Sequence, residues 1–158
     1  MNILVLCTGN SARSILLEAI LTRLGAPHGI KAWSAGSHPA GRVHPQALAL
    51  LAVKGYPTGD LRSKSWDEFA VPGAPQMDMV ITVCSSAAGE TCPLWPGTPL
   101  RAHWGVDDPA ALPKAAQSAG FAATYAQLAA RAEALCALDL RDVKRAKLAA
   151  ELNRIGVI

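Results

Sequence analysis

A cysteine and an arginine near the N-terminus have the spacing of a nucleophile and an anion clamp. The segment reads Cys-x5-Arg-Ser, with the residues Cys7, Thr8, Gly9, Asn10, Ser11, Ala12, Arg13 and Ser14. A five-residue loop that leads into a helix can point several backbone N–H groups at one spot, where the helix N-terminus adds a positive potential. Arg13 adds a planar, two-pronged donor for a tetrahedral oxyanion. The segment from Thr8 to Ser14 is therefore predicted to bind an oxyanion.

The sulfur of Cys7 is the predicted nucleophile of this loop. The positive field of the loop favours the thiolate over the thiol, which lowers the pKa of Cys7 and makes its sulfur reactive. Ser14 can donate a hydrogen bond to that thiolate, and Gly9 permits a backbone conformation with positive φ. The alternative interpretation of Cys7 is a small, buried apolar residue at the end of a strand.

An acidic pair stands much later in the chain, in the segment Asp107-Asp108-Pro109. A carboxylic acid beside a bound oxyanion can protonate a leaving oxygen, so this segment is a candidate source of the general acid. The alternative is an ordinary turn, because Asp and Pro are common turn formers.

The elements that must position these residues alternate between strands and helices. Expected strands cover residues 2–6, 30–33, 79–83 and 99–103, and expected helices cover 13–24, 44–53, 119–138 and 142–155. Residues 85–98, rich in Gly, Pro and Ser, are predicted to form a long loop. This alternation predicts the α/β class: a three-layer α/β/α fold with a four-stranded parallel sheet flanked by helices, built as one domain over residues 1–158.

Two cysteines are expected to meet at one edge of this sheet. Cys7 follows the first strand, and Cys84 follows the strand over 79–83. Ligands of open parallel sheets bind at the carboxyl ends of the strands, so both sulfurs are predicted to face one pocket.

The composition excludes several classes of protein. The chain has 158 residues, 51% of them hydrophobic and 17% charged, which is typical of an ordered globular domain rather than a disordered chain. The net charge of +3 is too small to indicate nucleic-acid binding. Neither a membrane-spanning run nor a signal peptide is expected, and the four cysteines lack the spacing of a metal site. The sequence therefore predicts a cytoplasmic protein with no membrane or metal partner.

The motifs together resemble a known family. The loop from Cys7 to Ser14 after its strand resembles the phosphate-binding loop of the low molecular weight protein tyrosine phosphatase fold. With Ser34-Ala35-Gly36-Ser37, Cys84, Cys92 and the stretch 103–109, the chain resembles arsenate reductases of that fold that are coupled to thioredoxin. The resemblance covers nearly the whole chain.

This resemblance implies a role for each matching residue. It makes Cys7 the nucleophile, Arg13 the oxyanion clamp and Ser14 the partner of the thiolate. Asp108 becomes the general acid, and Cys84 and Cys92 become the second and third redox cysteines. The alternative interpretation of Cys84 and Cys92 is a pair of unrelated buried thiols. The resemblance further implies a monomer without a cofactor that takes arsenate, with phosphate or sulfate as mimics. Its expected electron donor is thioredoxin, with glutaredoxin and glutathione as alternatives.

Two positions depart from the family pattern. Ala12 stands where some relatives carry another cysteine in the loop. Some relatives also bind potassium near the loop, through a carboxylate in the stretch that matches 63–65, and here Lys64 stands about there. Our hypothesis is that the Lys64 ammonium replaces the ion, close to Asn10 and Glu18; the alternative is a solvated surface lysine.

Two other functions compete with arsenate reduction. A phosphatase would need Cys7, Arg13 and Asp108 but neither Cys84 nor Cys92. Phosphatases of this fold that act on tyrosine carry aromatic residues after the Asp-Pro pair, whereas Ala110, Ala111 and Leu112 follow it here, which favours a small inorganic substrate. A non-catalytic oxyanion-binding module would leave the nucleophile, the acid and the thiol pair without a use.

Overall fold

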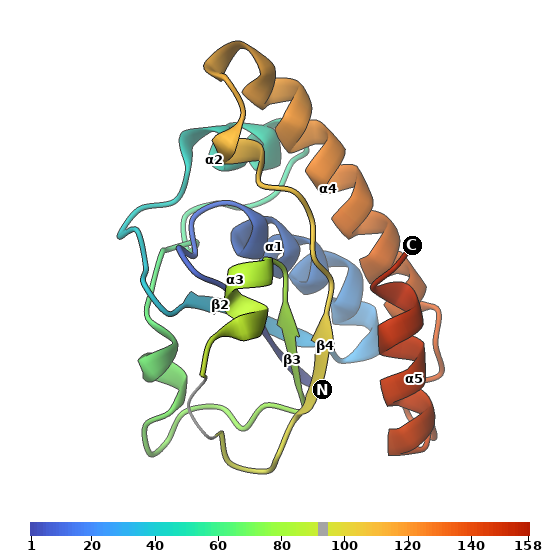
Figure 1. Cartoon of the computed structure of the whole chain (residues 1–158). Helices are drawn as coiled ribbons and strands as arrows, with labels where there is room; N and C mark the ends of the chain where they lie inside the picture. The colour runs from blue at the N-terminus through green and yellow to red at the C-terminus, as the bar shows by residue number, and fades with distance from the viewer. Residues whose placement is uncertain (92–94) are drawn as a thin grey trace.

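Four short parallel strands form the centre of this computed structural model, which describes residues 1–91 and 95–158 (Figure 1). The strands are β1 (Asn2–Cys7), β2 (Lys31–Gly36), β3 (Met79–Thr82) and β4 (Leu100–His103). They lie in the order β2-β1-β3-β4, and each neighbouring pair is parallel. The predicted α/β class and the four-stranded parallel sheet are confirmed.

The apolar run of β1 explains its central place in the sheet. Ile3, Leu4, Val5 and Leu6 are all completely buried. Successive side chains of a strand point to opposite faces, so Ile3 and Val5 join one apolar cluster while Leu4 and Leu6 join another. A strand buried on both faces needs such a continuous apolar run, which is why the sequence indicates it so clearly.

The α-helices cover the face to which Ile3 and Val5 point. The long elements of this layer are α1 (Arg13–Gly25), α2 (Pro45–Val53), α4 (Lys114–Cys136) and α5 (Arg145–Ile155). The opposite face is covered by the short 3-10 helix η2 (Trp66–Phe69) together with Met77 and Trp95. Among the described helices, none is both long and apolar enough to cross a membrane.

Several boundaries differ from the sequence predictions. β2 continues to Gly36, three residues beyond the end of the strand predicted over 30–33, because it pairs with β1 along its whole length. The predicted loop 85–98 contains a five-residue helix, α3 (Ser85–Gly89), which the side chain of Cys84 caps. α4 begins at Lys114, five residues before the predicted start, directly after Pro113. α5 begins at Arg145 instead of residue 142.

The strand order creates the place where a ligand can bind. From β1 the chain goes first to β2 on one side and later to β3 on the other side. The connections therefore diverge at the carboxyl ends of β1 and β3, the switch point at which open α/β sheets bind ligands. Cys7 is the last residue of β1, and Cys84 follows β3 by two positions.

Gly36 brings the end of β2 against the loop that follows β1. A Cβ atom on residue 36 would lie 2.4 Å from the carbonyl oxygen of Thr8 and 3.0 Å from the Asn10 backbone nitrogen. We expect Gly36→Ala to lower the free energy of unfolding by about 1–3 kcal/mol, since the backbone must shift to admit the methyl group. Chemical denaturation measures this change. Gly59→Ala is the matched control, because nothing lies within 4 Å of its added Cβ; equal stability of the two variants would contradict the close approach.

Candidate active site

The loop between β1 and α1 turns its carbonyl groups outward. Three of them accept backbone hydrogen bonds from the segment 38–44: Thr8 O from His38 N (3.0 Å), Gly9 O from Ala40 N (2.8 Å) and Ser11 O from His44 N (2.9 Å). Every peptide bond of this loop is trans, so each carbonyl points opposite to the N–H of the next residue. The N–H groups of Gly9, Asn10 and Ala12 therefore point to the inside of the loop, where they form a cradle for an anion.

The N-terminus of α1 adds to this cradle. Ala12 is its N-cap residue, no side chain caps it, and its first turn carries no acidic residue. The first N–H groups of the helix are thus available to donate hydrogen bonds to a ligand, and the helix dipole favours negative charge there.

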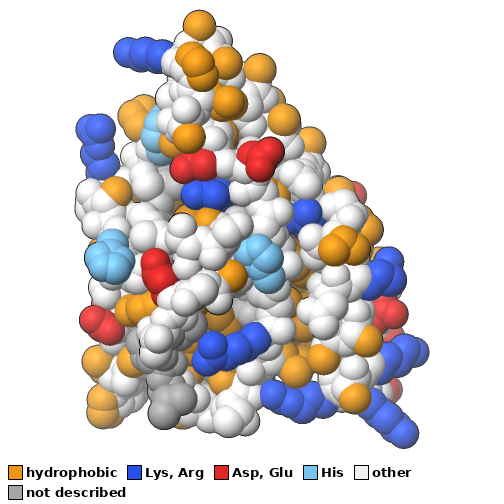
Figure 2. Space-filling model, viewed as in Figure 1, with side chains coloured by type: hydrophobic (Ala, Val, Ile, Leu, Met, Phe, Trp, Pro, Cys, Tyr) orange, Lys and Arg blue, Asp and Glu red, His pale blue; other side chains and the backbone are white. Residues whose placement is uncertain are grey.

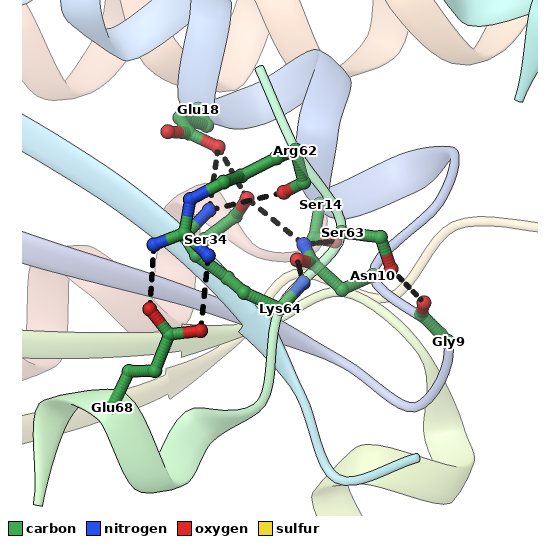
Figure 3. Close-up of polar contacts among 9 residues, drawn as sticks. All are labelled: Gly9, Asn10, Ser14, Glu18, Ser34, Arg62, Ser63, Lys64 and Glu68. Atoms are coloured by element: carbon green, nitrogen blue, oxygen red, sulfur yellow. Dashed lines mark hydrogen bonds and ion pairs between the residues drawn. The ribbon is translucent and has the colours of Figure 1, made fainter. Parts of the chain in front are cut away.

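Asn10 fixes the conformation of the loop from behind. Its φ of 44° lies in the left-handed region, which Asn tolerates better than most residues. Its completely buried amide donates hydrogen bonds of 2.9 Å to the hydroxyls of Ser14 and Ser34, and its oxygen accepts one of 2.9 Å from the Lys64 backbone (Figure 3). Three separate segments therefore hold the loop through one side chain.

A small cavity of about 110 Å³ lies inside the loop. It is lined by Cys7, Gly9, Asn10, Ser11, Ala12, Arg13, Asp108 and Ala110. This set includes most of the residues predicted to bind an oxyanion, whereas Thr8 and Ser14 are not among the lining residues. None of the described lining residues is aromatic, so the cavity suits a small inorganic oxyanion better than an aryl group.

Arg13 and Asp108 meet at the mouth of this cavity. Their side chains form an ion pair of 3.2 Å, and Arg13 also donates a hydrogen bond of 3.2 Å to the Val106 carbonyl oxygen. Asp108 caps the 3-10 helix η3 (Pro109–Ala111) by accepting a hydrogen bond of 3.0 Å from the Ala110 amide. The turn that was the alternative for this segment is thus present, and it is the turn that holds the carboxylate beside Arg13.

The sulfur of Cys84 lies next to that of Cys7. The two side chains lie close enough for each to shift the pKa of the other, and Cys84 further contacts the Thr8 hydroxyl at 3.7 Å and accepts a hydrogen bond of 3.4 Å from the Ala87 amide. Both cysteines are buried and free. The two cysteines thus lie together at the sheet edge, but of the two only Cys7 lines the loop cavity that both sulfurs were predicted to face. Cys92 lies outside the described residues.

The contact between the two sulfurs changes how they titrate. The hydrogen bond from Cys7 lowers the pKa of Cys84 to about 5, while the hydrogen bond with Cys84, followed by burial, raises the pKa of Cys7. The charge of Arg13 and the amide of Gly9 do lower the pKa of Cys7, as the sequence predicts. The effects of Cys84 and of burial are larger, so the net shift of the Cys7 pKa is upward. With the pKa of Cys84 at about 5 and that of Cys7 raised, the pair carries one negative charge at neutral pH.

Lys64 is buried, so the alternative of a solvated surface lysine is wrong. The residue is 7% exposed, and its ammonium lies 3.9 Å from the Glu18 carboxylate (Figure 3). Burial lowers the pKa of Lys64 and raises that of Glu18, so each charge depends on the other for compensation. Glu18 also accepts a hydrogen bond from the Ser34 hydroxyl, which connects this ion pair to Asn10. A side-chain cation already occupies the place beside Glu18, so these residues do not fit a metal cation there.

The fold and this loop define the class of protein, and the comparisons agree. The sequence profile of the low molecular weight phosphotyrosine protein phosphatase family matches residues 2–151, so the chain belongs to this family.

Within the family the chain is similar to arsenate reductases. It is 37% identical to the arsenate reductase of Bacillus subtilis (strain 168) over 106 residues, which are 66% of this chain and 71% of that relative. A solved structure of an arsenate reductase in the phosphate binding state superposes with a TM-score of 0.67 at 27% identity, over 86% of this chain and 96% of that one. The thioredoxin-dependent arsenate reductase of Corynebacterium glutamicum matches with a TM-score of 0.58 at 25% identity, over 80% of this chain and 57% of that one.

The shared proton gives a testable titration. In a Cys92→Ser, Cys136→Ser protein, which keeps only the Cys7–Cys84 pair, we expect one thiolate to form with a midpoint at about 5 and the second thiol to stay protonated far into alkaline pH. The ultraviolet absorbance of thiolate, followed against pH, measures both steps. Two ionisations close to the ordinary cysteine value of about 8.5 would show that the sulfurs do not interact.

Proposed function

We propose that this chain is an arsenate reductase that converts arsenate to arsenite by a relay of three thiols. The observation that carries the proposal is the second thiol, Cys84, which is buried beside the nucleophile of an oxyanion-binding loop and so close to it that each sulfur shifts the pKa of the other. A hydrolase of phosphate esters has no use for that sulfur. The similarity to arsenate reductases supports the same substrate.

The first step is nucleophilic attack on arsenic. Arsenate is a tetrahedral oxyanion, so it fits the inward amides of the loop and the guanidinium of Arg13. The Cys7 thiolate forms a bond to arsenic while one arsenic–oxygen bond breaks. Asp108 takes up a proton from the incoming hydrogen arsenate and passes it to the leaving oxygen, which departs as water. The ion pair of Arg13 with Asp108 places the two groups at the same side of the cavity, which is where this oxygen must leave.

The next steps are thiol–disulfide exchange. Cys84 attacks the Cys7 sulfur, a disulfide forms between them, and arsenite departs with the electron pair of the broken sulfur–arsenic bond. Cys92 then attacks Cys84, which frees Cys7 for another turnover. Disulfide Cβ atoms lie only about 4 Å apart, so Cys84 has to leave Cys7 before it can pair with Cys92. The segment that carries α3 must therefore change its conformation during the cycle.

A dithiol protein of the cytoplasm is the proposed electron donor. Thioredoxin is our first choice, because a structural relative is thioredoxin-dependent, and glutaredoxin with glutathione is the alternative. A reducing compartment keeps such thiols ready, so we place the enzyme in the cytoplasm, as a monomer. On the face drawn in Figure 2, Lys and Arg side chains near α5 are interspersed with acidic ones, a distribution that does not favour nucleic acid as a partner.

Cysteine variants separate the relay from hydrolysis. With arsenate, thioredoxin, thioredoxin reductase and NADPH, we expect NADPH oxidation by the wild type and none by Cys7→Ser, Cys84→Ser or Cys92→Ser. Weak cleavage of p-nitrophenyl phosphate should survive in the last two variants, because it needs the loop, Arg13 and Asp108 alone. Full turnover by Cys92→Ser with thioredoxin would contradict the three-thiol scheme. Much faster turnover of the wild type with glutaredoxin and glutathione would show that thioredoxin is not the electron donor.

We further propose that the Lys64 ammonium supports the loop in the way that potassium does in some relatives. Exchange of potassium for sodium should then leave the activity and the Tm of the wild type unchanged. Lys64→Ala leaves the Glu18 carboxylate buried without its cation, so the free energy of unfolding should fall by on the order of 3 kcal/mol. Lys147→Ala, at an exposed position of α5, is the matched control. A marked rise of wild-type activity with potassium would contradict the proposal.

A further inference from the structure

A carboxylate outside the predicted site is joined to Cys84 through one hydroxyl group. Glu90 directly follows α3, and its Oε1 accepts a hydrogen bond of 3.2 Å from the hydroxyl of Thr8. The same hydroxyl oxygen lies 3.7 Å from the sulfur of Cys84. A threonine hydroxyl has one hydrogen, and here that hydrogen points to Glu90. Either atom can be the donor of the contact between Thr8 and Cys84, and while the hydrogen of Thr8 points to Glu90 its oxygen can accept a hydrogen bond from the Cys84 thiol.

The chain of groups has a direction. A proton that leaves Cys84 can pass to the Thr8 oxygen while the hydrogen of Thr8 passes to the Glu90 carboxylate, and Thr8 is unchanged after the transfer. Glu90 is half-buried, and Thr8 is the residue next to the nucleophile Cys7. The path thus begins at a reacting sulfur and ends at a carboxylate on the segment between Cys84 and Cys92.

The proposed reaction requires such a path at one step. In the resting protein the pair of Cys7 and Cys84 holds one proton. The pKa shifts place this proton on Cys7 at rest, so it must pass to Cys84 when Cys7 bonds to arsenic as a thiolate. The hydrogen bond from Cys7 that favoured the Cys84 thiolate is then lost, because the Cys7 sulfur no longer carries a hydrogen. Cys84 must nevertheless become a thiolate to attack, since the thiol is a poor nucleophile.

We propose that Glu90 accepts the proton of Cys84 through the Thr8 hydroxyl and so activates the second nucleophile of the relay. This inference rests on the proposed reductase function and deepens it, because hydrolysis of a phosphate ester needs no second thiolate. Glu90 acts through Thr8 and does not itself touch the reacting atoms.

The step balances in atoms and electrons. The Cys84–Cys7 sulfur–sulfur bond forms as the Cys7 sulfur–arsenic bond breaks, and the electron pair of the broken bond stays on arsenic. Arsenic is reduced by two electrons from the pentavalent to the trivalent state, and the two sulfurs are oxidised to a disulfide. The proton of Cys84 ends on Glu90, from which water can remove it.

The test isolates this step in a Cys92→Ser protein, where the reaction stops at the Cys7–Cys84 disulfide. The reduced protein is mixed with arsenate without another reductant, and arsenite release and disulfide formation are followed in a single turnover. Adding Glu90→Gln should slow both about ten- to thirty-fold at neutral pH, because an unassisted thiol with a pKa of about 8.5 is only a few per cent thiolate there. The deficit should disappear as the pH rises above that value. Glu90→Asp, which keeps the carboxylate, should recover part of the rate.

Controls separate this role from a structural one. Glu133→Gln, the same substitution at an exposed position of α4, should leave the rate of disulfide formation unchanged. If Glu90→Gln slows p-nitrophenyl phosphate cleavage as much as disulfide formation, or if its deficit is equal at every pH, Glu90 only supports the loop and the proposal is wrong. If Glu90→Gln forms the disulfide at the normal rate, the path is not used. If the Cys92→Ser parent protein itself releases no arsenite, the proposed reductase function is wrong, whatever Glu90 does.

Discussion

The close approach of the Cys7 and Cys84 sulfurs puts one negative charge on a pair of buried atoms at the carboxyl edge of the sheet. Burial by itself disfavours such a charge, so the surroundings must offset the cost. They do so with the inward amides of the loop, the open N-terminus of α1 and the guanidinium of Arg13. Each of these groups would serve an incoming oxyanion equally well. The site is therefore already arranged for a negative charge before the substrate enters.

Holding the loop in this shape requires a rigid support behind it. The positive φ of Asn10 is an unfavourable conformation, and three hydrogen bonds of its side chain stabilise it. One of these leads through Ser34 to Glu18 and its ion pair with Lys64. The Glu18–Lys64 ion pair lines a separate and larger cavity. It helps to hold the loop in place through the hydrogen bonds that join Glu18 to Ser34 and Ser34 to Asn10. A buried polar network of this kind specifies one conformation only while all its members are paired.

The sequence predicted the elements that apolar patterning controls and missed those that depend on pairing between distant segments. β1 and the loop after it were predictable, because an apolar run followed by Gly and Asn ends a strand clearly. The proximity of Cys7 and Cys84 followed from the rule for parallel sheets. In contrast, Ser34 lies just outside the strand predicted over 30–33, although its place in β2 is what brings it to Asn10. The helix α3 was missed because Ser85–Gly89 has no apolar periodicity, and its N-cap is a cysteine, which is an unusual cap.

Competition between water and a thiol decides whether such a loop hydrolyses or reduces. After Cys7 has bonded to the central atom of the oxyanion, water can attack that atom, whereas a thiolate can attack the sulfur instead. In the proposed relay, the closeness of Cys84 to Cys7 gives the thiolate the advantage of proximity, which can be worth several orders of magnitude over a group that diffuses freely. Phosphorus does not accept the electron pair in this chemistry, but pentavalent arsenic does. The same loop can therefore release phosphate slowly by hydrolysis and arsenite rapidly by reduction. The short helix α3 fits this demand, because a helix of five residues has little stability of its own and can rearrange once the disulfide has formed.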